Sequence, residues 1–161
     1  MPACSSWVGL AVPIFMYLYS CIASALTISL ASLATSSTWV AGVESDPVDN
    51  TTNKYLDYLL AGKITVGTTP TANTEIRVYV IGMISDSLWP DVVDGTGSAE
   101  TFTSAGVRDG FAKLAAVMQV DATTSNVAYY FGPLSVASLF GGVVPKKFTV
   151  LVTHNTAVNL N

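Results

Sequence analysis

The sequence predicts an all-β fold, namely a β-sandwich of the jelly-roll or immunoglobulin-like type with about seven or eight strands. Short segments of apolar or alternating residues recur after residue 25. Clusters of Gly, Pro, Asn, Asp, Ser and Thr separate these segments roughly every 8–15 residues, which is typical of turns in such folds. No segment has the sustained periodicity of a long helix. The chain therefore divides into an apolar N-terminal segment, residues 1–25, and a β-sandwich domain, residues 26–161.

Three segments in the first half of the domain are predicted as strands. Residues 26–31 alternate between apolar and polar side chains, as a half-buried strand does. Residues 38–43 follow a Ser/Thr turn and form a short second strand. Residues 54–66 are long and rich in apolar and aromatic side chains, and Gly62 within them indicates a bulge or a bend.

Residues 75–84 give the clearest strand pattern. One face begins at Ile76 and is apolar throughout. The opposite face begins with Glu75 and Arg77 and becomes apolar from Ile81 onward. Since successive side chains of a strand point to opposite faces, we expect the end of this strand to be covered on both sides.

The second half of the domain is less regular. Residues 85–104 are expected to form a loop, because they contain a Trp-Pro pair, three aspartates and two glycines. Residues 111–120 combine good helix formers with an alternating pattern, and we interpret them as a strand because a glycine and a turn flank them. Residues 127–131 and 147–153 are predicted strands, and residues 135–140 a single helical turn.

The N-terminal segment is unusually apolar, since residues 1–43 contain no Asp, Glu, Lys, Arg or His. As a helix rising about 1.5 Å per residue, residues 7–25 would nearly span the hydrocarbon core of a bilayer. A second interpretation is a secretory signal peptide cleaved after Ala25, because residues 23–25 fit a small-x-small cleavage site. A third is a hydrophobic arm that packs in an assembly, or an extension from a misplaced start codon.

Charge and cysteine content exclude several classes of function. Seven Lys and Arg against eleven Asp and Glu give a net charge of −4, which argues against a broad basic face for nucleic acid. Both cysteines, Cys4 and Cys21, precede the domain, so the domain is neither a disulfide scaffold nor a Cys-based zinc protein. The glycine patterns that cradle phosphates are absent. We therefore expect no nucleic-acid partner and no cofactor.

Two groups of residues are candidates for chemistry. Asp86, Asp91 and Asp94 share one segment and offer the hard oxygen ligands that Ca²⁺ prefers. Their spacing differs from that of an EF-hand, and turn formation is the simpler explanation of such aspartates. His154, the single histidine, would have to serve any Ser-His-Asp arrangement, but no GxSxG elbow accompanies it. We expect His154 to bond to backbone in a turn, and we predict no catalytic residue.

The amino-acid sequence of the domain as a whole resembles that of a known family. The resemblance begins with LTISLASLATSSTWVAGVESDPVDNTTNKYLDYLLAGKITVGTTPTANTEIRVYV and continues in WPDVVDGTGSAET, FGPLSVASLFGGVVPKKF and VTHNTAVNLN. These segments are similar to a group of small structural proteins of tailed bacteriophages, of the head decoration or accessory capsid type. The resemblance covers residues 26–161 and rests on no single diagnostic motif.

The resemblance implies a non-enzymatic virion protein, either a capsid decoration (cement) protein or another accessory shell component. Its expected partners are the major capsid or other virion proteins and further copies of itself in a homo-oligomer. Its expected location is the virion. The alternative is a secreted or membrane-tethered β-sandwich that binds carbohydrate or another surface ligand, and a membrane is involved only if residues 1–25 are a true anchor.

Two departures from the group bear on the ends of the chain. Residues 1–25 look foreign to the group, which favours an arm or an extension over a signal peptide. Members of the group also continue with one more strand beyond the equivalent of Asn161, so we expect this chain to lack an edge or closing strand.

Particle proteins bind by shape over many symmetric copies, so that weak single contacts add up. An apolar set along the chain is the candidate for such an interface. Its members are Ile81, Met83, Trp89, Val92 and Val93.

Overall fold

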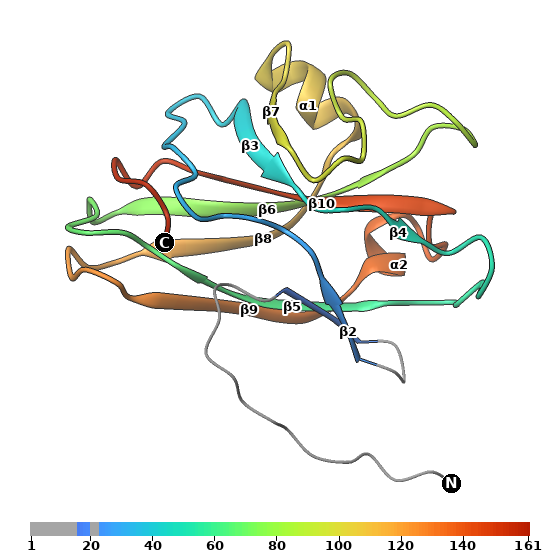
Figure 1. Ribbon diagram of the computed structural model, residues 1–161, viewed down its shortest axis with the longest axis horizontal. Coiled ribbons are helices and arrows are strands. Elements are labelled where there is room, and N and C mark those ends of the chain that lie inside the picture. The colour runs from blue at the N-terminus through green and yellow to red at the C-terminus, as the bar shows by residue number, and fades with distance from the viewer. Residues whose placement is uncertain (1–15, 20–22) are drawn as a thin grey trace, which may run out of the picture.

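The computed structural model describes residues 16–19 and 23–161 and is mostly β, with antiparallel sheets (Figure 1). Within these residues, all the helices are short. The elements in chain order are β1 (Met16–Tyr19), β2 (Ala23–Leu26), β3 (Ala41–Glu44), β4 (Val48–Asp49), β5 (Leu59–Thr65), β6 (Thr74–Gly82), β7 (Ala99–Thr101), α1 (Ala105–Phe111), β8 (Lys113–Val120), β9 (Ala128–Ser135), α2 (Val136–Leu139) and β10 (Lys147–His154).

The strands form two sheets. The larger has the order β7-β3-β10-β6-β8, and β4 also pairs with β10. The smaller has the order β2-β1-β5-β9. Figure 1 shows β5 and β9 as a layer on one side of β6, β8 and β10, with β7 and α1 on the other side. Every neighbouring pair is antiparallel, and the strand that comes last in the sequence lies inside the larger sheet.

The main core lies between the two layers. It exists because β6 and β10 place alternate apolar side chains on the face turned towards β5 and β9. Its largest fully buried members from these strands are Phe148, Leu60, Ile64 and Ile76. The alternation predicted for residues 26–31 is confirmed in burial, since Leu26, Ile28 and Leu30 are buried and the residues between them are exposed. Only Leu26 of that segment belongs to a strand, at the end of β2.

A second, smaller core covers the other face of the larger sheet. Tyr79, Ile81 and Leu151 contribute the sheet side, and residues from the long connection between β6 and β8 close over them. These covering residues are Val93, Phe102 and Ala112, with Val40, Trp89, Val92 and Phe111 packed against the cluster. The prediction that the end of the strand at residues 75–84 is covered on both sides is confirmed.

Two elements occur in and just after the segment that was predicted as a loop, residues 85–104. Strand β7 lies within residues 85–104, and α1 follows it directly. The helix begins after Ser104, whose side-chain oxygen accepts a hydrogen bond from the Val107 backbone at 3.1 Å. With seven residues, α1 is too short to show a helical repeat, which is why periodicity missed it.

Most of the remaining assignments agree with the structure, and one strand begins later than predicted. Residues 111–120 are mainly strand β8, paired along β6, and residues 135–140 contain the single turn of α2. Strand β5 starts only at Leu59, so the first part of the predicted strand at 54–66 is loop. The predicted irregularity at Gly62 is confirmed by a register shift between β5 and β9 at Leu60 and Gly62.

The hypotheses for the N-terminal segment concern residues that are described only in part. Residues 1–15 and 20–22, including Cys4 and Cys21, lie outside the described residues. Within residues 7–25, the described pieces belong to β1 and β2, which pair with each other, and β1 also pairs with β5. These pieces are therefore strands rather than parts of one helix. Among the helices of the described chain, none has the length and apolar character needed to span a bilayer.

Candidate functional site

The three aspartates that are candidates for calcium binding do not come together. Asp86 pairs with Lys146 at 2.7 Å, and both side chains are well exposed. Asp91 accepts hydrogen bonds from the backbone and hydroxyl of Thr103, at 2.9 and 2.8 Å. Only Asp94 lies in a cluster of carboxylates. The three candidates therefore do not form one calcium site, because Asp86 and Asp91 have separate partners.

The carboxylate cluster joins Asp94 to two residues from the larger sheet. One oxygen from each of Glu44, Asp94 and Glu100 lies within 4.8 Å of the other two. Glu44 is the last residue of β3, and Glu100 is in the middle of β7, the strand beside it. Asp94 is in the loop that leads into β7. Strand β3 and the distant segment that holds Asp94 and Glu100 thus place acidic side chains at one edge of the sheet.

Glu44 is the buried member of this cluster. The residue has 0% exposure, and its Oε1 accepts hydrogen bonds from the backbone of Gly95 at 2.7 Å and of Thr96 at 3.0 Å. Its other oxygen, Oε2, is buried and has no hydrogen-bond partner among the described residues. Burying a carboxylate oxygen without a hydrogen-bond partner costs free energy, so the position of Oε2 needs an explanation.

The loop is shaped to reach Glu44. Gly95 and Gly97 have φ values of +74° and +71°, a left-handed conformation that glycine adopts without strain. A Cβ on Gly95 would stand 3.0 Å from the indole nitrogen of Trp89, and one on Gly97 would stand 2.6 Å from Asp46 Oδ1. Both glycines therefore allow the loop to pack closely while it presents its backbone donors.

The electrostatics of the cluster follow from burial and crowding. Burial, together with the neighbouring Asp94 carboxyl, raises the pKa of Glu44 to about 7, although the backbone donors of Thr96 and Gly95 oppose this shift. The Thr96 side chain, which donates to Asp94 Oδ1 at 2.6 Å, lowers the pKa of Asp94. Glu100 accepts a hydrogen bond from Ser98 Oγ at 2.7 Å.

Sequence reasoning found one member of this cluster and missed two. Glu44 and Glu100 are 50 and 6 residues from Asp94 and belong to different strands, so no local spacing connects them. One signal was present: Glu44 ends an otherwise apolar strand and is followed by two further polar residues. The pairing of β3 with β7, on which the cluster depends, becomes visible only in the fold.

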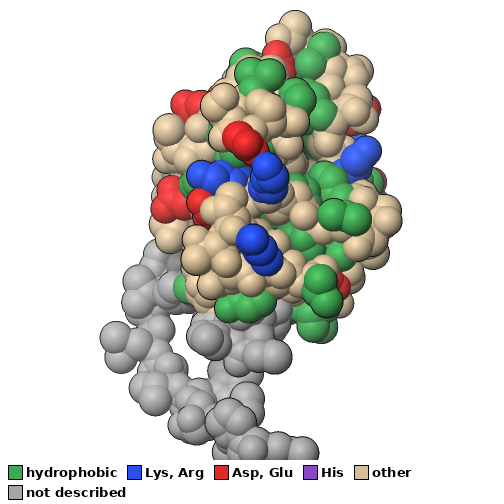
Figure 2. All heavy atoms as spheres, turned by 90° about the vertical axis from the view of Figure 1, so that its right-hand side faces the viewer, with side chains coloured by type: hydrophobic (Ala, Val, Ile, Leu, Met, Phe, Trp, Pro, Cys, Tyr) green, Lys and Arg blue, Asp and Glu red, His purple; other side chains and the backbone are tan. Residues whose placement is uncertain are grey.

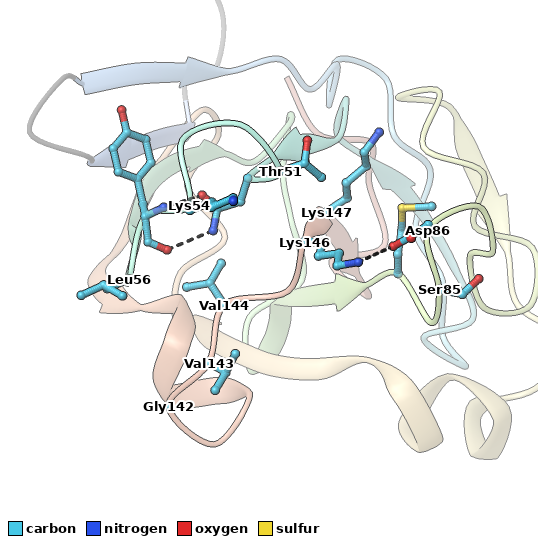
Figure 3. A pocket seen from close by; sticks show the side chains of 13 residues that line it. Thr51, Lys54, Leu56, Ser85, Asp86, Gly142, Val143, Val144, Lys146 and Lys147 are labelled. Carbon is cyan, nitrogen blue, oxygen red and sulfur yellow. Dashed lines mark hydrogen bonds and ion pairs between the residues drawn. The ribbon is translucent and has the colours of Figure 1, made fainter.

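A second feature is a hollow of about 750 Å³ at one end of the molecule (Figure 3). Its walls are the loop after β4, the start of the loop after β6 and the loop between α2 and β10. Leu56, Val143 and Val144 gather on one side of the hollow, and the Lys146–Asp86 pair lies on the other. Leu56 and Val143 expose 90% and 71% of their surface.

Basic and acidic side chains border the hollow. Lys146 pairs with Asp86, and Lys147 pairs with Asp49 at 3.0 Å. Figure 2 views this end of the molecule and shows Lys and Arg side chains between hydrophobic and acidic ones. The surface is therefore mixed, with apolar side chains on one side of the hollow and charged ones on the other.

The five residues predicted as an interface are mostly interior. Ile81 and Val93 are 0% and 4% exposed and belong to the second core, so they present no surface for a partner. Trp89 and Val92 are half-buried and pack against the same core. Met83 is half-buried and lines the hollow. The prediction was wrong for Ile81 and Val93 because the long loop and α1 fold back over that face.

His154 has a structural environment. It is fully buried, and its Nε2 lies 3.0 Å from the Leu33 carbonyl oxygen, to which it donates. Its Nδ1 lies 2.9 Å from the Thr156 hydroxyl. His154 thus bonds to backbone as expected, but it does so from the end of strand β10 rather than in a turn, and the carbonyl of Leu33 is remote in the sequence.

Comparison with known proteins gives no relative of this chain. No family model matches it, and neither a curated protein nor a solved structure matches it significantly.

Proposed function

We propose that this chain is a non-enzymatic virion structural protein, a capsid decoration (cement) protein or another accessory shell component. In this proposal its sheets form a β-sandwich of the jelly-roll or immunoglobulin-like type. The resemblance of residues 26–161 to small tailed-phage proteins suggests the class. The observation that carries the proposal is the hollow with Leu56 and Val143 at its rim, because it offers an exposed apolar surface for a shell partner.

The apolar residues at the rim would each contribute a weak contact, and such contacts become strong together when many copies bind one shell. Burying one large aliphatic side chain contributes about 1.5–3 kcal/mol, so Leu56 and Val143 give a weak contact per copy. On a symmetric shell many such contacts act together, and the overall binding becomes strong. The charged border formed by Lys146, Asp86 and Lys147 would then fix the orientation of each copy.

The loop that carries Leu56 is held in place before any partner binds. The Asn50 side chain accepts a hydrogen bond from the Tyr55 backbone at 2.7 Å and donates one to the Tyr55 carbonyl at 3.0 Å. The Tyr58 hydroxyl donates to Asn50 Oδ1 at 2.9 Å. A preorganised loop loses little conformational entropy on binding, which favours its use as a docking surface.

Two steps test this proposal. First, the native protein is located by intact mass in purified particles, membranes and medium of its source. Second, the chain and its variants are mixed with shells that lack it, and binding is measured by co-sedimentation. Leu56→Asp and Val143→Asp should each weaken shell binding by about tenfold or more, because a charge replaces a buried apolar contact.

The matched control is Val117→Asp on β8, which is 48% exposed and does not line the hollow. It should bind shells as the unchanged chain does. Equal binding by all three variants would remove the hollow from the proposal. Recovery of the native chain from membrane or secreted fractions, with none in particles, would overturn the virion function and favour the surface-ligand alternative.

A further inference from the structure

We propose that Glu44, Asp94 and Glu100 bind a calcium ion, which joins β3, β7 and the loop that precedes β7. This inference is independent of the proposed function. It rests on three observations among the described residues: the spacing of the three carboxylates, the Glu44 oxygen without a hydrogen-bond partner, and the lack of an ion pair between the cluster and a basic side chain.

The spacing fits one shared ion. Ca²⁺ binds oxygen ligands at about 2.3–2.6 Å, so two oxygens on the same ion are at most roughly 5 Å apart. The ligand oxygens of the three residues all lie within 4.8 Å of one another. The three carboxylates can therefore contact a single ion without a rearrangement of the strands.

The orphaned oxygen of Glu44 supplies the independent observation. Oε1 is fixed by the backbone donors of Gly95 and Thr96, which orient the carboxylate. Oε2 is buried and lacks a partner among the described residues, although the residue has 0% exposure. An ion at this position would satisfy Oε2 and offset the cost of burying the charge.

No basic side chain neutralises the cluster. The ion pairs of the described residues involve Glu75, Asp109, Asp86 and Asp49, and none includes a member of the cluster. The segments outside the description cannot supply a basic side chain either, because residues 1–43 contain no Lys, Arg or His. Three carboxylates that approach one another without a counter-charge favour a bound cation.

The donor set favours calcium over other divalent ions. All the ligands are oxygens, and no His or Cys is present in the cluster. Ca²⁺ accepts irregular sets of six to eight oxygens, whereas Mg²⁺ demands near-octahedral geometry at shorter distances. Asp94 is exposed, so water reaches the ion from this side and completes its coordination.

The test is calcium binding to the full chain, first stripped of metal with a chelator. Isothermal titration with CaCl₂ should give one site per chain, and Asp94→Asn and Glu100→Gln should each weaken it by about tenfold or more. Calcium at about a hundredfold above Kd should raise Tm by roughly 5 °C or more. Asp86→Asn is the matched control, since it removes an aspartate of the same loop that is paired with Lys146, and it should leave calcium binding unchanged.

Trp89 offers a second readout. Its indole packs on Gly95, whose backbone bonds to Glu44, so a Tb³⁺ ion in the site should luminesce when tryptophan is excited. CaCl₂ should displace this emission, and Trp89→Phe should reduce it while calcium binding persists. Luminescence that Asp94→Asn and Glu100→Gln leave unchanged would place the ion elsewhere and overturn the site.

The variant Glu44→Gln distinguishes two explanations of the cluster, namely a bound ion and a proton shared between carboxyl groups. The amide keeps an oxygen acceptor for Gly95 and Thr96 and removes the charge. Without calcium this variant should be at least as stable as the unchanged chain; with calcium only the unchanged chain should gain stability. A chain that shows no calcium binding and no rise in Tm at millimolar CaCl₂, or one that binds MgCl₂ as tightly, would overturn the proposal.

Discussion

The guanidinium of Arg108 lies 5.0 Å from the centre of the Tyr79 ring, within the second core. Arg108 is 3% exposed, and it donates hydrogen bonds to the Trp39 carbonyl and to Asp109 Oδ1, the latter at 2.9 and 2.6 Å. One buried cation thus connects α1, β6 and the segment before β3. This arrangement holds α1 against the larger sheet.

We expect Arg108→Ala to lower the free energy of unfolding by about 3 kcal/mol, because the Trp39 carbonyl and the Tyr79 ring lose a buried partner. Arg108→Lys should recover only part of this loss, since an ammonium cannot reproduce the planar fork. Chemical denaturation measures both. Lys113→Ala, at an exposed position just after α1, serves as the control and should change little. A loss below about 0.5 kcal/mol for Arg108→Ala would show that α1 is held by other contacts.

Two glycines should respond to alanine in opposite directions. A Cβ on Gly42 in β3 would stand 2.6 Å from the Val152 carbonyl oxygen, which is backbone and cannot move aside cheaply. Gly42→Ala should therefore destabilise the chain by about 1–3 kcal/mol. Gly110 in α1 has no atom within 4 Å of that position, so Gly110→Ala should stabilise by about 0.5–1 kcal/mol. Thermal unfolding of the two variants side by side checks the pair, and shifts of the same sign would contradict it.

Acidification should weaken the fold through His154. Burial lowers the pKa of His154 below its ordinary 6.5, although the hydrogen bond to Leu33 opposes the shift. Above pH 6.5 the side chain is neutral in both states. Below it the unfolded chain takes up a proton that the native chain does not, so stability falls by at most about 1.4 kcal/mol per pH unit towards the native pKa.

The measurement is Tm between pH 7 and pH 5 for the unchanged chain and for His154→Gln, whose amide can still donate to the Leu33 carbonyl. The difference between the two profiles removes the contribution of all other groups. We expect the unchanged chain to lose more stability on acidification than the variant. Parallel profiles would mean that His154 titrates alike in the folded and unfolded states.

Local pattern was sufficient for most of the strands. The alternation of residues 75–84 predicted both faces of β6, including the change at Ile81 that marks the second core. The choice between helix and strand for residues 111–120 depended on flanking turns and was correct, because β8 pairs with β6 from Thr74 to Val80. The spacing of apolar side chains reveals which face of a strand is buried, because every second side chain of a strand points to the same face.

The predictions that were wrong or missing concern contacts between segments that are distant in the sequence. Ile81 and Val93 were taken for surface because the sequence does not show that residues 85–112 fold back over the larger sheet. Glu44 and Glu100 were not recognised as neighbours of Asp94 because the pairing of β3 with β7 brings them there. The hollow was missed for the same reason, since its walls come from three segments that are remote from one another in the sequence.

The place of β10 in the larger sheet has a consequence for synthesis. It lies between β3 and β6, and it is formed by residues 147–154. While the chain is still on the ribosome, β3 and β6 have already emerged but lack the strand that separates them. Pairing across such long stretches of sequence is slow, and it leaves apolar strand faces open in the meantime. We therefore expect the nascent chain to remain dependent on chaperones until the residues of β10 have left the ribosome, and to close its larger sheet only then.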